Sequence, residues 1–97
     1  MAFSCGRGAR LPEDLSRAES LLDSRPDSAL TILDSSSYSE TSGRYLYASY
    51  CLLRTFAEYN AYKPGIDEDM MNVGVDYFLK YGNRNRKAQA YYLRAVV

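Results

Sequence analysis

The chain has 97 residues, the size of one small domain, and its positive and negative side chains balance at 12 each, which argues against a dedicated nucleic-acid or membrane-surface protein. It contains no histidine, the commonest general acid–base group and metal ligand, so no Ser-His-Asp or Cys-His arrangement can form within it. We therefore expect a protein that is not an enzyme and that holds no cofactor or metal.

The first ten residues contain glycines and arginines without an apolar period, and we expect residues 1–10 to be disordered. The run from Phe3 to Gly6 resembles the end of a bacterial lipoprotein signal, in which Cys5 would be lipidated. The hydrophobic segment that such a signal needs does not precede it. The compartment therefore stays open between a bacterial cell envelope and the cytoplasm. No stretch reaches the roughly 20 apolar residues of a membrane span.

A first helical hairpin is expected over about residues 12–36. Pro12 suits a first helical turn, and the acids that follow it complement the helix dipole. This helix is expected to end near Ser24, and Pro26 opens the next one by the same logic. Apolar stripes at helical spacing run through both helices: Leu15, Ala18, Leu21 and Leu22, then Ala29, Leu30, Ile32 and Leu33. Because the connection is so short, the two helices must pack as antiparallel neighbours.

A second hairpin is expected over about residues 42–81. Thr41 or Ser42 can cap its first helix, which runs to about Tyr62. Apolar side chains cover more than half of the circumference of this helix. We therefore expect it to lie centrally, with partners on two sides.

The second helix of this hairpin and a further helix complete the pattern. Asp67 can cap the helix that follows the Lys63–Gly65 break, and Gly82 suits a left-handed C-terminal cap. A fifth helix is expected over about residues 84–97. Its apolar pattern stops at Val97 without a closing signal, so we expect bare apolar surface there and a longer repeat protein around this chain.

Helix pairs joined by short turns, with small residues where helices cross, resemble tetratricopeptide-repeat (TPR) proteins. The run from Leu15 to Leu22, followed by residues 26–30 and Leu33, is especially similar to the first repeat of bacterial TPR proteins, many of which are envelope lipoproteins or extracytoplasmic parts of regulatory proteins. Residues 87–93 resemble the first helix of a third repeat. The helix spacing departs from the usual period of about 34 residues, so the repeats are degenerate.

The resemblance covers roughly residues 11–97 and implies an all-α domain. Its antiparallel hairpins would form a short right-handed solenoid of about five helices. A TPR-like chain of this kind binds a protein or peptide in the groove lined by the first helix of each pair. The implied function is therefore a non-catalytic interaction module.

The ten tyrosines supply the candidate binding face. Those that fit core positions between helices are Tyr45, Tyr77 and Tyr91. Others lie on flanks where not all can be buried, and exposed tyrosines on a rigid helical groove are good peptide contacts. The candidate contact residues are Tyr47, Tyr50, Arg54 and Tyr92.

Two alternative functions stay open. The chain can be architectural, with the bare face of the fifth helix packed on another copy in a homo-oligomer. It can also bind nucleic acid through the basic 80–94 stretch, although the same charges are typical of a solvated turn. The cations of this stretch are Lys80, Arg84, Arg86, Lys87 and Arg94.

Two smaller features are interpreted structurally. Cys51 lies in an apolar helical run and is expected in the core, with a disulfide to Cys5 left open. The acids 67–69 lack the spacing and the glycine of a calcium loop, so we expect them to start a helix and not to hold a metal.

Overall fold

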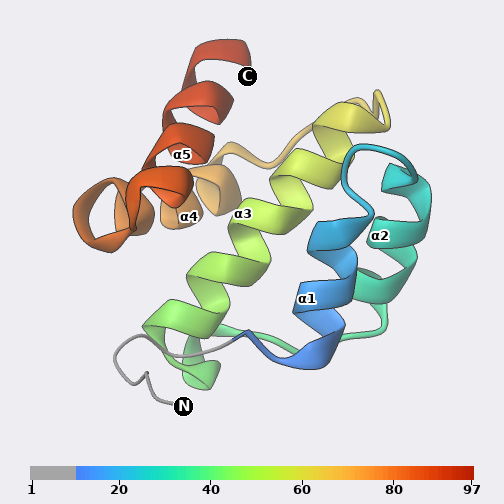
Figure 1. Cartoon of the computed structure of the whole chain (residues 1–97), viewed down its shortest axis with the longest axis horizontal. Helices are drawn as coiled ribbons and strands as arrows, with labels where there is room; N and C mark the ends of the chain where they lie inside the picture. Colours follow the sequence, from blue (N-terminus) through green and yellow to red (C-terminus); the bar gives the residue numbers. More distant parts are fainter. Residues whose placement is uncertain (1–10) are drawn as a thin grey trace.

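The computed structural model describes residues 11–97 (Figure 1). Its elements in chain order are α1 (Glu13–Ser20), α2 (Pro26–Asp34), the 3₁₀ helix η1 (Glu40–Ser42), α3 (Arg44–Asn60), α4 (Glu68–Tyr81) and α5 (Arg84–Val96). No strand occurs in this range, so the expectation of an all-α fold with five α-helices is confirmed for residues 11–97. The expectations for residues 1–10, including lipidation of Cys5 and a disulfide to it, lie outside the described residues.

The first hairpin is shorter than expected at one boundary. α1 ends at Ser20 and residues 21–24 form a turn, in which the Leu21 carbonyl accepts a hydrogen bond from the Arg25 amide at 2.9 Å. α2 begins at Pro26, as predicted, because proline fits the first helical position. The two helices run antiparallel (Figure 1).

The start of α3 differs from the prediction. Thr41 and Ser42 do not cap it, because both lie in η1, which Ser39 caps. The Ser39 hydroxyl accepts a hydrogen bond from the Thr41 amide, while the Ser42 hydroxyl accepts one from the Ser39 amide. Gly43 then connects η1 to α3 at a φ of 104°, a conformation that favours glycine.

α4 begins as predicted, but it ends differently. The Asp67 carboxylate accepts hydrogen bonds from the amides of Asp69 and Met70, so it caps the helix. Gly82 is not left-handed; its φ is −76°. Glycine is needed there for space, since a Cβ would lie 2.5 Å from the Phe78 carbonyl oxygen. Asn83 then caps α5 by accepting a hydrogen bond from the Arg86 amide.

Two hydrophobic clusters share the central helix α3. The first cluster joins α1, α2 and the second half of α3, and its buried residues include Leu15, Leu33, Leu53 and Ala57. The second cluster joins the first half of α3 to α4 and α5, and its buried residues include Leu52, Val75, Phe78 and Leu93. Phe56 packs against both clusters. The expected central position of this helix is therefore confirmed, with α1 and α2 on one side and α4 and α5 on the other (Figure 1).

The contacts between the helices follow a regular order along the chain. Each α-helix contacts the next one in the chain, α3 also contacts both α1 and α5, and α2 does not contact α4. α4 crosses α3 at very short range, since a Cβ on Gly74 would lie 2.8 Å from the Leu52 nitrogen and 3.1 Å from the Ala48 oxygen. No helix within residues 11–97 has the length and apolar character needed to cross a membrane.

Candidate functional site

The four predicted contact residues do not form one surface. Tyr47, Tyr50 and Arg54 follow one another along one side of α3. Tyr92, on α5, stacks on Phe56 with ring centroids 5.7 Å apart. Phe56 lies nine residues after Tyr47, and nine steps of about 100° place it on the opposite side of the helix. The structure therefore groups three of the candidates and separates Tyr92 from them.

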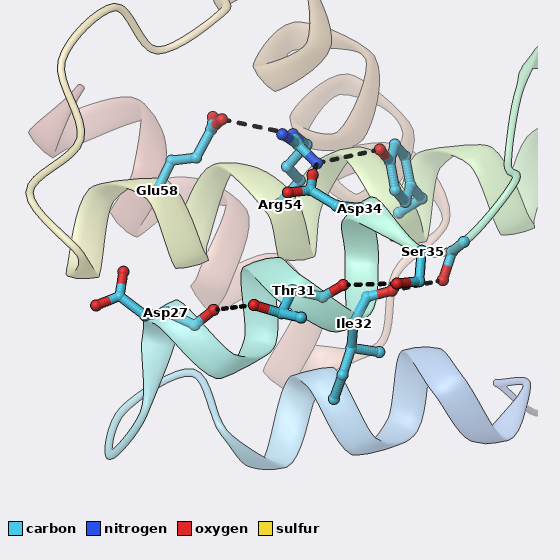
Figure 2. A network of polar contacts seen from close by, with 9 residues as sticks. Asp27, Thr31, Ile32, Asp34, Ser35, Arg54 and Glu58 are labelled. Atoms are coloured by element: carbon cyan, nitrogen blue, oxygen red, sulfur yellow. Dashed lines mark hydrogen bonds and ion pairs between the residues drawn. The ribbon is translucent and has the colours of Figure 1, made fainter.

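Arg54 is occupied by contacts within the protein (Figure 2). Its guanidinium forms ion pairs with Asp34 on α2 and with Glu58 on α3, and it donates to the Tyr50 hydroxyl. Burial alone would lower the pKa of Arg54, but the hydrogen bond to Asp34 and the nearby charges raise it. This side chain therefore ties α3 to α2 and has little capacity left for a partner.

Tyr50 is also held by its neighbours. Its ring lies 5.9 Å from the ring of Tyr38 and 6.4 Å from the ring of Tyr47, measured between centroids. Tyr50 is half-buried against the first cluster. Of the three grouped candidates, Tyr47 lines a groove beside α3.

This groove, of about 380 Å³, lies between the first half of α3 and the outer face of α4. We call it the α3–α4 groove. Ala48, Val73 and Tyr77 supply apolar surface to it, and Val73 remains 40% exposed. Three- and four-residue steps along α4 place Val73, Tyr77 and Lys80 on one side of that helix. Meanwhile Met71, Val75 and Phe78 face the second cluster.

Two cations and a tyrosine lie at one end of the α3–α4 groove. The Arg44 guanidinium lies 5.8 Å from the Tyr77 ring centroid and 5.5 Å from that of Tyr81. The Lys80 ammonium lies 5.4 Å from the Tyr81 centroid. Arg44, by hydrogen bonding, and then Lys80 lower the pKa of the Tyr81 phenol below its ordinary value. Tyr81 remains 53% exposed, so this end of the groove is open to solvent.

The two acids that line the groove differ in whether they form an ion pair. Asp76 forms an ion pair with Arg94 of α5 at 2.7 Å. Glu40, on η1, is exposed and has no ion pair with another described residue. Because Asp76 is largely neutralised by Arg94, the charge that the groove offers a ligand comes mainly from Arg44, Lys80 and Glu40, with cations in excess.

Cys51 lies behind Tyr47 and is fully buried, so the expectation that it belongs to the core is confirmed. Burial raises the pKa of its thiol to about 11, although a hydrogen bond with Tyr47 opposes this shift. The interaction with Cys51 in turn raises the pKa of Tyr47. A neutral, buried thiol is not a nucleophile at physiological pH, so Cys51 acts as a packing residue.

Tyr92, on α5, borders a second, polar hollow beside the end of α3 and the turn that follows α1. Asp23, Tyr59 and Asn60 line it as well, and the Asn60 amide donates to the Leu22 carbonyl at 2.9 Å. Partial burial and then the neighbouring Tyr59 raise the pKa of Tyr92. Its apolar surface is already covered in part by the Phe56 and Tyr59 rings.

Some cations of the basic 80–94 stretch form ion pairs within the protein. Arg86 forms a bidentate ion pair with Glu19 of α1, with N–O distances of 2.7 and 2.9 Å. Arg94 is paired with Asp76. Two of its cations are therefore engaged in ion pairs within the protein. Within residues 11–97 no cluster of three potential metal-ligating side chains is found.

The exposure of Tyr91 contradicts its expected core position. Tyr91 is 65% exposed, whereas Tyr45 and Tyr77 are half-buried against the second cluster. The sequence also did not identify Val73 and Arg44 as candidates. A usable signal was that α4 carries two adjacent apolar stripes, Met70, Val73 and Tyr77 beside Met71, Val75 and Phe78.

Comparisons with known proteins add no functional assignment. A scan against protein-family models and searches of curated proteins and of solved structures find no match to this chain.

Proposed function

We propose that this chain is a non-catalytic, TPR-like interaction module that binds a segment of another polypeptide in the α3–α4 groove. This site lies between the two helices of the second hairpin and differs from the expected groove lined by the first helix of each pair. The observation that carries the proposal is the open apolar surface of Val73 and Tyr77 next to Arg44 and Lys80. Apolar surface flanked by a few polar groups is typical of binding sites. The volume of about 380 Å³ suits a short peptide segment.

The contact scheme of the helices supports the TPR-like part of the proposal. In a stack of helical hairpins, each helix packs on the next, and the first helices of successive pairs also touch. α1, α3 and α5 are related in this way, while α2 and α4 are apart. The close approach at Ala48 and Gly74 supplies the small residues that such crossings need.

Selection from an unbiased random peptide library on the immobilised chain tests the proposed function. We expect peptides to be enriched and to bind the purified chain in fluorescence anisotropy. Val73→Gln removes apolar groove surface without adding charge, and it should weaken binding about fivefold, the equivalent of roughly 1 kcal/mol. The matched control is Ala88→Gln on the exposed side of α5, which should change the affinity by less than about twofold.

Two of the predicted contact residues, Tyr47 and Tyr92, distinguish binding in the groove from binding in the hollow beside Tyr92. Tyr47→Ala should weaken peptide binding, whereas Tyr92→Ala should leave it unchanged, because Tyr92 borders a different site. If Tyr92→Ala weakens peptide binding and Tyr47→Ala does not, the peptide binds at the hollow and not in the groove. A library that yields no peptide dependent on Val73 or Tyr47 would refute the groove as the binding site.

Self-association through α5 is the second candidate function. The exposure of Tyr91 at 65%, together with the exposed Val96 and Val97, favours it. In this case α5 would pack on another copy of the chain, and the module would be architectural.

A further inference from the structure

The α3–α4 groove is lined by two cations, Arg44 and Lys80, that share one aromatic ring. Arg54, Arg86 and Arg94 each form an ion pair that joins two helices. Neither Arg44 nor Lys80 forms an ion pair with any residue between 11 and 97. Both cations instead lie over the ring of Tyr81.

Arg44 and Lys80 both lie at the Tyr81 end of the groove. Arg44 belongs to the first turn of α3 and Lys80 to the last turn of α4, and each lies within 5.5 Å of the Tyr81 centroid. The Tyr81 hydroxyl is a further hydrogen-bond donor at the same end. These three groups therefore place positive charge and hydrogen-bond donors at one end of the groove, where an anionic group of a ligand can contact them.

We infer that the peptide bound by this groove is acidic: an Asp or Glu carboxylate of the partner is held by Arg44 and Lys80, and an apolar partner residue beside it lies on Val73. This inference rests on the proposed function, since it names the chemistry of the same site. Guanidinium and carboxylate groups match in shape and form two parallel hydrogen bonds. The adjacent apolar contact supplies affinity, and the ion pairs supply selectivity between partners.

The surrounding charges agree with this choice of ligand. Asp76, one of the two acids that line the groove, is already paired with Arg94. Glu40 is the other acid that lines the groove, and it lies on η1 next to the start of α3. A cationic peptide would have to compete with Arg94 for Asp76 and would be repelled by two cations.

The composition of the selected peptides is the first test. We expect peptides enriched on the native chain to contain Asp or Glu next to an apolar residue. The Arg44→Gln/Lys80→Gln double variant should lose this acidic preference. Arg17→Gln/Lys87→Gln is the matched control, because it removes the same charge from exposed positions of α1 and α5 outside the groove.

Affinities measured by anisotropy form the second test. Arg44→Gln/Lys80→Gln should weaken binding of a selected peptide roughly tenfold, since each partly exposed ion pair contributes up to about 1 kcal/mol. Replacing the peptide's acids by amides should weaken binding to the native chain, but it should not weaken binding to this variant further. The control variant should keep the full penalty for the peptide change.

The outcomes distinguish the acidic-ligand inference from the proposed function. Enriched peptides without acids, or an equal amide penalty on the native chain and on Arg44→Gln/Lys80→Gln, would overturn the acidic-ligand inference and leave the proposed function intact. If no peptide is enriched, the proposed function fails and the inference fails with it. Circular dichroism on each variant shows whether the helices are retained.

Discussion

Asp14 shows how one side chain can connect two distant segments of the fold. Its carboxylate accepts hydrogen bonds from the Tyr38 hydroxyl at 2.9 Å, from the Ser36 hydroxyl at 2.8 Å and from the Leu15 amide at 2.8 Å. These bonds tie the first turn of α1 to the loop that follows α2. Burial by itself would raise the pKa of Asp14, but these hydrogen bonds together lower it.

Asp14→Asn should lower the free energy of unfolding by about 1–2 kcal/mol at pH 7, because hydrogen bonds to a charged acceptor are lost. The folded-state pKa of Asp14 lies below its unfolded value of about 3.9. The stabilisation is therefore fully present above the unfolded pKa, and it disappears as the pH falls through the folded pKa. Urea unfolding at pH 7 and at successively lower pH should show the native chain and the variant converging.

Glu13→Gln is the control for this pH series. Glu13 is exposed in the same helical turn, so its replacement should change stability by less than about 1 kcal/mol. A difference between the native chain and Asp14→Asn that does not shrink toward low pH would show that the charge of Asp14 is not responsible.

The tyrosines show where residue-scale prediction fails. The sequence placed Tyr91 in the core, because aromatic residues at helical spacing are usually buried. In the structure Ala90 and Leu93 fill the interface of α5, and Tyr91 faces outward. The apolar faces that a short helix offers to its neighbours differ in the size of their side chains as well as in their hydrophobicity. Which face fits depends on how closely the partner helix approaches, and the sequence does not contain that distance.

At the scale of elements, Gly74 sets the approach of α4 to α3. A glycine inside a helix is normally destabilising relative to alanine by roughly 0.5–1 kcal/mol. Here a Cβ would meet the backbone of Leu52 at 2.8 Å, and backbone cannot rotate away as a side chain can. The helices would have to separate, which loosens the contact between Ala48 and Gly74.

Gly74→Ala should therefore destabilise the protein by about 1–3 kcal/mol, against the trend of helix propensity. Thermal unfolding followed by circular dichroism measures the change. Ser16→Ala, at an exposed position of α1, should be neutral or slightly stabilising. If Gly74→Ala were stabilising, the tight crossing of α4 on α3 would be wrong.

Helix boundaries were predictable where one residue has a single role. Pro26 and Asp67 begin α2 and α4 as expected, because no neighbouring residue competes for the same function. The segment before α3 offers several serines and a threonine that are equally able to cap. Ser39 caps η1, and Gly43 connects η1 to α3. The groove depends on how α3 and α4 pack, so only some of its residues were foreseen.

At the scale of the whole molecule, the outer face of α5 decides whether copies associate. Tyr91 is flanked at helical spacing by Arg84, Lys87 and Arg94. A twofold contact through this face would bring the cations of one copy against those of the other, and only Arg94 among them has an internal ion pair within residues 11–97.

We therefore expect a monomer in sedimentation equilibrium at physiological salt, with a weight-average mass that does not change with protein concentration. Tyr91→Glu should leave this mass unchanged. A mass that rises with concentration, and that Tyr91→Glu returns to the monomer value, would favour the architectural function over peptide binding.

The position of α3 between the two clusters affects how loss-of-binding variants are interpreted. One side of this helix supports the groove, and its other side packs in the first cluster. A cavity made at Leu53 or Leu15 would allow α3 to shift, so it would distort a site that neither residue touches. Variants that abolish peptide binding can therefore map to the first cluster, and only those that keep native stability identify true contact residues.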